Sequence, residues 1–302
     1  MNAQEELIHQ FQIYLKLELS HAENTVENYL RDVQKLYQFI NSREKPSTFQ
    51  KLKLQDLQEF MIYLYEMGIG EQSQARIISG LKAFYSFLLT EDLIKENPCD
   101  LLEAPKLQRK LPDTLSYAEI QMMLDAVDLS KPEGMRNRAI LETLYSCGLR
   151  VSELVSLTIA NLFLDIGFIK VVGKGNKERL VPIGNEAKKF IEIYRKEIRV
   201  HTSPQKDSEN VLFLNRRGKK LSRVMIFLIV KETAELAGIK KKVSPHTFRH
   251  SFASHMIEGG ADLRAIQEML GHVSITTTEI YTHIDQDFLR TELLKFHPRY
   301  SK

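Results

Sequence analysis

Apolar residues recur at three- and four-residue steps through the first hundred residues of this chain, and this spacing is typical of helices. The longest such run consists of Val26, Tyr29, Leu30, Val33, Leu36, Tyr37 and Ile40. The same spacing predicts a third helix over about 54–67, ended by Gly68 and Gly70, and a fourth over about 72–93. We therefore predict four helices and no strand here. The aromatic side chains of the fourth helix are expected to pack in a core rather than around a ligand.

A basic stretch with prolines separates this region from the rest of the chain. It contains Pro98, Pro105 and Pro112, together with the basic run 106–110. Because proline prevents a helix from continuing, we predict a linker over 97–113, between a domain at 1–96 and a second domain at 114–302. The length of 302 residues also suits two domains of about 150 residues each.

The second region carries signals for both helices and strands. Ser116 and Glu119 form a capping-box pattern that starts a helix, and two further helices are expected at about 133–147 and 150–158. Residues 168–172 and 179–183 are typical of two strands joined by the Gly-rich turn 173–178. The remainder is expected to be helical, with breaks at Pro204, Gly218, Pro245, Gly259-Gly260 and Gly271. The chain is therefore predicted to be mainly α, with a mixed α/β second domain that holds a small antiparallel sheet.

Composition and charge exclude several classes of protein. Hydrophobic residues make up 43% and charged residues 27%, as in a soluble globular protein. The longest apolar run, 224–230, is far shorter than the ~20 residues of a membrane helix, and the N-terminus has no apolar block typical of a signal peptide. We therefore expect a cytoplasmic protein without membrane insertion. Cys99 and Cys147 form neither a disulfide framework nor a metal spacing.

The charge is unevenly distributed along the chain. Residues 1–108 hold 11 Lys and Arg against 16 Asp and Glu, whereas residues 109–302 hold 31 against 23. The second region thus carries a net charge of +8, which indicates an anionic partner. A surplus charge of this size is also common on a solvent-exposed surface that binds no anion.

Several polar residues stand at expected helix starts and turns of the second region. Arg150 follows the break at Gly148, and His246 and Arg249 follow the helix-start pair Ser244-Pro245. Each motif alone is more often packing or a surface hydrogen bond than a site. His246 and His250 have a metal-like spacing, but Arg249 lies between them and no carboxylate completes a zinc set, so we expect no metal and no cofactor.

Taken together and in order, these residues resemble the tyrosine recombinase (phage integrase) family, over essentially the whole chain. The motifs that carry the resemblance are Arg150, Lys174, His246-x-x-Arg249, Leu270-Gly271-His272 and Tyr281. The stretches 143–154, 173–179, 260–264 and 297–299 resemble more narrowly the Xer subfamily. The resemblance implies a four-helix SAM-like core-binding domain followed by a tyrosine recombinase catalytic domain.

The resemblance also implies a role for each site residue in a metal-independent cleavage of DNA. Arg150 and Arg249 would bind phosphate oxygens as planar, permanently charged forks. His246 and His272 would donate to the same oxygens, with one of them accepting the proton of the nucleophile. Lys174 would give a proton to the leaving 5′ oxygen. Tyr281 would attack to form a 3′-phosphotyrosyl link, which leads through a Holliday junction to rejoining without ATP.

The implied function is resolution of chromosome dimers at a dif-like site. The implied partners are double-stranded DNA, a second Xer-type recombinase in a heterotetramer or the chain itself in a homotetramer, and a DNA translocase of the FtsK type. Alternatives are a mobile-element integrase or invertase, a relaxing topoisomerase, and a DNA-binding protein without catalysis. The intact set of six residues argues against the binding protein, and the compact length without an arm-binding domain argues against a phage-type integrase.

An apolar stripe follows Tyr281 at the end of the chain. Its members are Ile284, Phe288, Leu289, Leu293 and Phe296, on a helix too short to be stable alone. Periodicity leaves open that this tail folds back on its own domain. The resemblance favours docking of the tail into a neighbouring subunit.

Overall fold

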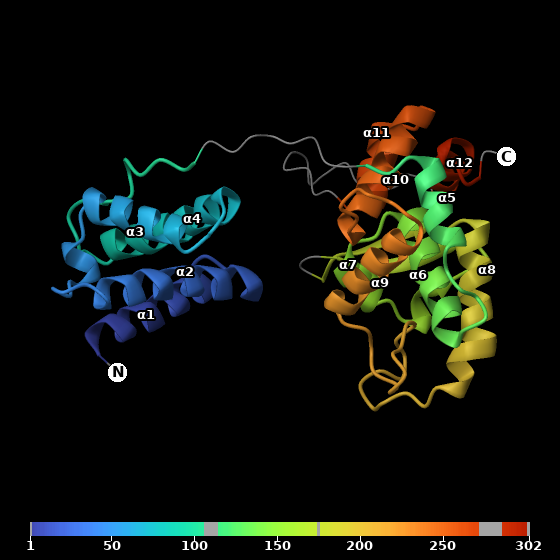
Figure 1. Ribbon diagram of the computed structural model, residues 1–302, viewed down its shortest axis with the longest axis horizontal. Coiled ribbons are helices and arrows are strands. Elements are labelled where there is room, and N and C mark those ends of the chain that lie inside the picture. The colour runs from blue at the N-terminus through green and yellow to red at the C-terminus, as the bar shows by residue number, and fades with distance from the viewer. Residues whose placement is uncertain (1, 106–113, 174–175, 272–285, 301–302) are drawn as a thin grey trace. The chain divides into compact units, whose positions relative to one another are not determined.

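A computed structural model describes residues 2–105, 114–173, 176–271 and 286–300 of the chain (Figure 1). The chain divides into two compact units, Met1–Lys110 and Leu111–Lys302. Within the described residues, no helix is long and apolar enough to cross a membrane.

The first unit consists of four α-helices, as the apolar spacing predicts. They are α1 (Ala3–Leu17), α2 (Glu23–Asn41), α3 (Leu54–Glu66) and α4 (Glu71–Thr90), with a single 3-10 turn at Phe49–Lys51. The described residues of this unit contain no strand. Helix α1 begins in a capping box, in which the Asn2 side chain accepts from the Glu5 amide at 2.9 Å and the Asn2 amide donates to the Glu5 carboxylate at 2.9 Å.

The core of this unit is aromatic, and helix α4 supplies much of it. Phe84 is fully buried and meets Phe11 and Phe49 edge-on, with ring centroids 5.1 Å and 4.9 Å apart. Tyr85 is also fully buried and donates its hydroxyl to the Phe49 carbonyl at 3.1 Å. The prediction that the aromatic stripe is core packing is therefore confirmed.

The beginning of the stretch expected to be a linker belongs to this same core. Cys99 and Leu102 are buried in it, at 0% and 4% exposure. This short irregular segment, which follows the end of α4 at Thr90 and contains Pro98, buries these two apolar side chains. The first unit thus extends past the predicted boundary at residue 96.

The second unit follows the predicted order of helices and hairpin. Helix α5 (Tyr117–Asp125) begins at the predicted capping box, with the Ser116 amide donating to Glu119 Oε2 at 2.7 Å. It is followed by α6 (Pro132–Cys147) and α7 (Val151–Val155). The sheet consists of β1 (Leu162–Phe163), β2 (Phe168–Val172) and β3 (Glu178–Pro182), antiparallel in the order β1-β2-β3. The two predicted strands are confirmed, whereas β1 is too short to show a period in the sequence.

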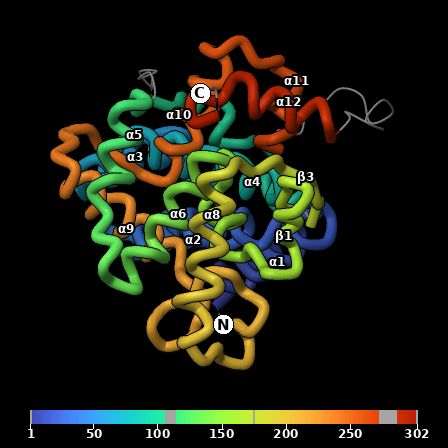
Figure 2. The backbone as a smooth tube through the Cα atoms, turned by 90° about the vertical axis from the view of Figure 1, so that its right-hand side faces the viewer, coloured from blue at the N-terminus to red at the C-terminus, as the bar shows by residue number. Residues whose placement is uncertain are grey.

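The remaining helices are α8 (Asn185–Ile193), α9 (Arg223–Leu236), α10 (Pro245–Gly259), α11 (Leu263–Leu270) and α12 (Gln286–Phe296). The helical expectation is wrong for 202–222 as a whole, a stretch that contains the predicted breaks at Pro204 and Gly218: it forms turns and the isolated bridges Thr158↔Val211 and Leu214↔Lys220. Helix α6 is buried over most of its length, and α8 packs beside it (Figure 2). Helices α10, α11 and α12 pack against one another and share a small apolar core.

The tail after residue 285 packs on its own unit. Leu289 and Leu293 of α12 are buried in the core that α10 and α11 provide, whereas Phe288 stays 39% exposed. This is the fold-back arrangement, and it differs from the docking on a neighbouring subunit that the resemblance favours. Ile284 lies outside the described residues.

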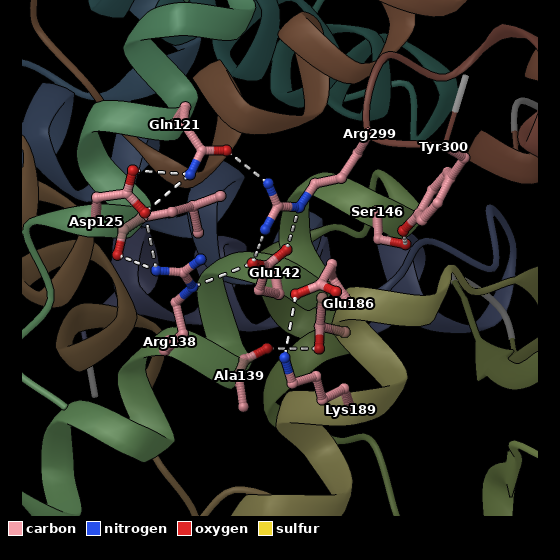
Figure 3. Close-up of polar contacts among 12 residues, drawn as sticks. Gln121, Asp125, Arg138, Ala139, Glu142, Ser146, Glu186, Lys189, Arg299 and Tyr300 are labelled. Carbon is pink, nitrogen blue, oxygen red and sulfur yellow. Dashed lines mark hydrogen bonds and ion pairs between the residues drawn. The ribbon is translucent and has the colours of Figure 1, made fainter. Parts of the chain in front are cut away.

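Beyond α12, the last residues bind to helix α6. Arg299 donates to Glu142 Oε2 at 2.9 Å and to Oε1 at 2.5 Å, and Tyr300 shares a 2.7 Å hydrogen bond with the Ser146 hydroxyl (Figure 3). His297 is fully buried, with its ring 4.6 Å from the ring of Tyr145. The tail is therefore fixed by an ion pair and by aromatic packing as well as by the apolar face of α12.

His297 makes the second unit sensitive to acid. Burial lowers the pKa of His297 to about 3, because the imidazolium loses its hydration there. The unfolded chain, with a histidine pKa of about 6.5, binds the proton more readily than the folded one, so the contribution of His297 to stability is unchanged above about pH 6.5 and falls by up to about 1.4 kcal/mol per pH unit below it. We expect His297→Phe to flatten this part of the pH dependence.

The measurement is urea unfolding of the full chain at pH 7.5 and pH 5.0. The exposed His201, replaced by Gln, serves as the control in the same unit and should leave the wild-type pH dependence unchanged. Equal loss of stability at pH 5.0 in wild type and His297→Phe would contradict the prediction.

Candidate active site

Arg150 is held at a sharp junction between two helices. Helix α6 ends at Gly148, which has φ +57°, and a Cβ there would lie 2.6 Å from Phe252 Cδ1 and 3.0 Å from Leu270 Cδ2. Glycine is thus required both by the left-handed backbone and by the close packing. Two residues later Arg150 caps α7, with its amide donating to Glu153 Oε2 at 2.8 Å.

The Arg150 side chain reaches back towards the end of helix α11. Nη1 donates to Glu153 Oε1 at 3.0 Å, and Nη2 donates to the Gly271 carbonyl at 3.1 Å. The side chain remains 35% exposed. These contacts orient the guanidinium while leaving part of it accessible to an anion.

Arg249 approaches the same place from helix α10. This helix begins with the predicted Ser244 cap and Pro245 at its first position, which places His246 and Arg249 in its first two turns. Arg249 is buried, and its two terminal nitrogens donate to the carbonyls of Gly148 at 2.8 Å and Leu270 at 2.7 Å. Burial and the nearby charge of Arg150 lower the pKa of Arg249 to about 10, so it remains protonated at neutral pH.

A third arginine, Arg179 of strand β3, completes the cluster. Its Nε donates to the Met269 carbonyl at 2.9 Å, and its two terminal nitrogens form a bidentate pair with Glu153 at 2.8 Å and 3.0 Å. Burial raises the pKa of Glu153, but hydrogen bonds from Arg179 and from the Arg150 amide outweigh that effect and hold the pKa below its ordinary value. Glu153 is thus an ionised carboxylate shared by two arginines.

The four side chains carry three positive charges against one negative charge. Three consecutive carbonyls at the carboxyl end of α11, those of Met269, Leu270 and Gly271, accept from Arg179, Arg249 and Arg150 respectively. These carbonyls have no partner within the helix and lie at the negative end of its dipole, so they stabilise the cations without cancelling their charge. We call this group the arginine cluster, and its surplus positive charge suits a phosphate group.

Three of the six predicted site residues are described by the structure, and it brings two of these together in the cluster. Arg150 and Arg249 belong to it, and His246 is exposed three residues before Arg249 on α10. Lys174, His272 and Tyr281 lie outside the described residues. Their chain neighbours are informative, because a Cβ at Gly173 would lie 3.5 Å from Arg179 Nη1 and one at Gly271 would lie 3.0 Å from Arg179 Cζ.

Sequence reasoning missed Glu153 and Arg179 as members of the cluster. The signal for Glu153 is its place three residues after the N-cap Arg150, where a carboxylate accepts from the cap amide. The signal for Arg179 is its phase in β3, because it lies two residues before the fully buried Val181 and therefore on the same face. An arginine on the inward face of a strand predicts a buried carboxylate partner.

The described residues contain no group of three side chains that could hold a metal ion. Cys147, at the end of α6 beside the cluster, is completely buried, and burial raises the pKa of its thiol to about 12. It is a packed core residue rather than a nucleophile.

Two family models match the chain. Residues 113–287 match the phage integrase family, and residues 8–92 match the N-terminal SAM-like domain of phage integrases. A tyrosine recombinase XerD from Chlorobaculum tepidum is 45% identical over 290 residues, which cover 95% of this chain and 94% of that protein. Another from Oceanobacillus iheyensis is 40% identical, over 97% of this chain and 98% of that protein. The stretches 173–179 and 260–264 favour the XerD type over the XerC type, in agreement with these relatives.

Solved structures share the fold. The Tn1549 transposon integrase in complex with circular intermediate DNA has a TM-score of 0.72 at 23% identity, over 95% of this chain and 98% of that chain. The XerH recombinase bound to difH substrate has a TM-score of 0.67 at 24% identity, over 93% of this chain and 82% of that chain. The predicted fold, mainly helical with a SAM-like N-terminal domain and a small antiparallel sheet in the second, is thereby confirmed.

The junction at Gly148 yields a test of how tightly the cluster is built. Gly148→Ala should place a methyl group against Phe252 and Leu270 in a left-handed backbone conformation, which together cost about 2 kcal/mol or more of unfolding free energy. Gly238 has φ +72° and nothing within 4 Å of its Cβ position, so Gly238→Ala should cost only about 1 kcal/mol. Urea unfolding of the two variants decides, and equal losses would show that Gly148 is needed for its backbone conformation alone.

Proposed function

The chain belongs to the phage integrase family and is a tyrosine recombinase, and from this premise we propose that it resolves chromosome dimers at a dif-like DNA site. The observation that carries the site chemistry is the arginine cluster, which presents surplus positive charge at a partly exposed arginine fork. Relatives named XerD, at 40% and 45% identity over nearly the whole chain, support the Xer assignment over a mobile-element integrase. The same argument favours an enzyme over a DNA-binding protein without catalysis.

Arg150 and Arg249 bind the scissile phosphate in this proposal. Transfer of a phosphodiester passes through a state with increased negative charge on the non-bridging oxygens, and fixed cationic donors stabilise that state more than the ground state. Arg150 is exposed enough to contact a phosphate oxygen directly. Arg249 is buried and would lie at the bottom of the site. His246, exposed at the start of α10, donates to the phosphate, and His272 acts beside it.

Tyr281 is the nucleophile and Lys174 the general acid. The tyrosine oxygen forms a bond to phosphorus, the 5′ oxygen of the next nucleotide leaves, and Lys174 gives that oxygen a proton. A histidine of the pair His246 and His272 accepts the tyrosine proton. The 3′-phosphotyrosyl link retains the energy of the broken bond, so that a second DNA strand can reverse the reaction and rejoin without ATP.

The proposed partners rest on the chemistry and on the family resemblance. Double-stranded DNA with a dif-like site is the substrate, which places the protein in the cytoplasm with the chromosome. Exchange of two strand pairs requires four active sites, supplied by this chain with a second Xer-type recombinase or by four copies of it. A DNA translocase of the FtsK type activates the assembly.

Tyr281→Phe should abolish the covalent protein–DNA complex and leave DNA binding nearly unchanged, because only the attacking oxygen is lost. The assay uses a suicide substrate with a nick near the cleavage site, run in excess chelator, beside a gel shift on the same DNA. Tyr300→Phe is the matched control: it also removes one phenolic oxygen, from a tyrosine bonded to Ser146, and should give adduct. Adduct from Tyr281→Phe, or a requirement for added magnesium, would overturn the proposed chemistry.

The exposed side of α12 tests the proposed assembly. Phe288 is 39% exposed, whereas Leu293 of the same helix is buried at 1% exposure. If the tail contacts a neighbouring subunit, Phe288→Ala should leave binding to a half-site intact but reduce cooperative binding to a full site and strand exchange. Leu293→Ala should instead lower stability by about 2–5 kcal/mol and weaken both binding assays. Full cooperativity in Phe288→Ala would contradict a role of this face in assembly.

A further inference from the structure

Arg179 differs from Arg150 in where its donors point. All of its nitrogens donate inward, to the Met269 carbonyl and to both oxygens of Glu153, and its side chain is 9% exposed. Arg150 is 35% exposed and has one carboxylate oxygen and one carbonyl as side-chain partners. Each nitrogen of Arg179 is thus engaged with a protein partner, and the side chain is far less accessible to a phosphate than that of Arg150.

The contacts of Arg179 join three separate elements. It lies on β3, within the hairpin 168–182, and binds Glu153 of α7 and the carboxyl end of α11. Its guanidinium also lies against the backbone at both Gly173 and Gly271. These glycines directly precede Lys174 and His272 in the chain. The Arg179 side chain therefore packs against the residue that comes before each of these two predicted site residues.

Removal of Arg179 would affect these elements unequally. Arg150 would keep Glu153 and the Gly271 carbonyl, and Arg249 would keep the carbonyls of Gly148 and Leu270. The hairpin would lose its ion pair to α7 and its hydrogen bond to α11. Lys170 and Glu178 pair with each other at 3.2 Å across the hairpin and so do not tie it to the rest of the unit.

We infer that Arg179 is a positioning residue for strand cleavage, which holds the hairpin that carries Lys174 against α7 and the end of α11. The inference rests on the proposed role of Lys174 as general acid. Arg179 acts through the hairpin and touches no reacting atom. Its loss therefore weakens proton donation to the leaving oxygen more than it weakens phosphate binding by Arg150 and Arg249.

The experiment compares two suicide substrates that differ in one atom at the cleavage site. One has the ordinary 5′-bridging oxygen, and the other has a 5′-bridging sulfur, whose thiolate leaves without a proton. Arg179→Met, which removes the charge at similar length, should cleave the oxygen substrate on the order of 10²-fold more slowly than wild type. With sulfur it should recover to within about tenfold of wild type, as expected for loss of a general acid.

Three further variants make the result interpretable. Lys174→Ala should show the same loss with oxygen and the same recovery with sulfur. Lys170→Met removes the neighbouring ion pair of the hairpin and should cleave both substrates like wild type. Arg179→Lys keeps the charge but not the planar fork, and should fall between Arg179→Met and wild type while retaining the recovery with sulfur. Gel shifts on a half-site verify that each variant is folded.

Each other outcome overturns a distinct statement. Equal loss of cleavage on both substrates in the Arg179 variants, with recovery in Lys174→Ala, would show that Arg179 does not act through the general acid. No loss in either Arg179 variant would show that the hairpin is held without it. Absence of recovery in Lys174→Ala itself would instead overturn the proposed role of Lys174. If Arg179→Met binds no DNA, the comparison rests on Arg179→Lys.

Discussion

The carboxyl end of helix α11 is the point on which the site of this protein depends. A helix leaves its last carbonyls without partners inside the helix, and here three consecutive ones each accept from an arginine of a different element. Those arginines come from the start of α7, from β3 and from α10. Each approaches the same short stretch of backbone, so side chains from distant parts of the second unit converge there.

Glu153 makes this convergence possible. Two guanidinium groups that lie close together repel each other, and burial adds a desolvation cost. A carboxylate at 3% exposure, shared by Arg150 and Arg179, offsets both effects. Removal of one partner from such a buried pair typically costs about 3–5 kcal/mol, because the other charge is left without compensation. The cluster is therefore preorganised, as the proposed binding of a phosphate requires.

Local signals in the sequence predicted most of the fold. Apolar periodicity gave the four helices of the first unit, the Ser116 cap gave the start of α5, and the Gly-rich turn gave the β2–β3 hairpin. Features that depend on distant partners were not predicted, because a capping or periodic pattern involves only neighbours in the chain. The pairing of Glu153 with Arg179 spans 26 residues, and burial of Cys99 in the first unit depends on helices that precede it. The family resemblance supplied Arg150 and Arg249 of the cluster, but neither Glu153 nor Arg179.

The tail packs on its own chain, and identical subunits could form the same contacts between them. Leu289 and Leu293 bury their side chains on α10 and α11, which contributes about 1.5–3 kcal/mol for each, and Arg299 adds a buried ion pair with Glu142. Exchange of identical tails between subunits would replace each of these contacts by the same contact in trans. The equilibrium between fold-back and exchange would then depend on the connecting segment and on the entropy of association, and not on the interface. That connection, 272–285, contains His272 and Tyr281. It is bounded by Gly271, fixed by Arg150, and by α12, fixed by its apolar face. In the proposed mechanism the docking position of the tail would therefore affect the reach of Tyr281, and fold-back in one chain is compatible with exchange between subunits.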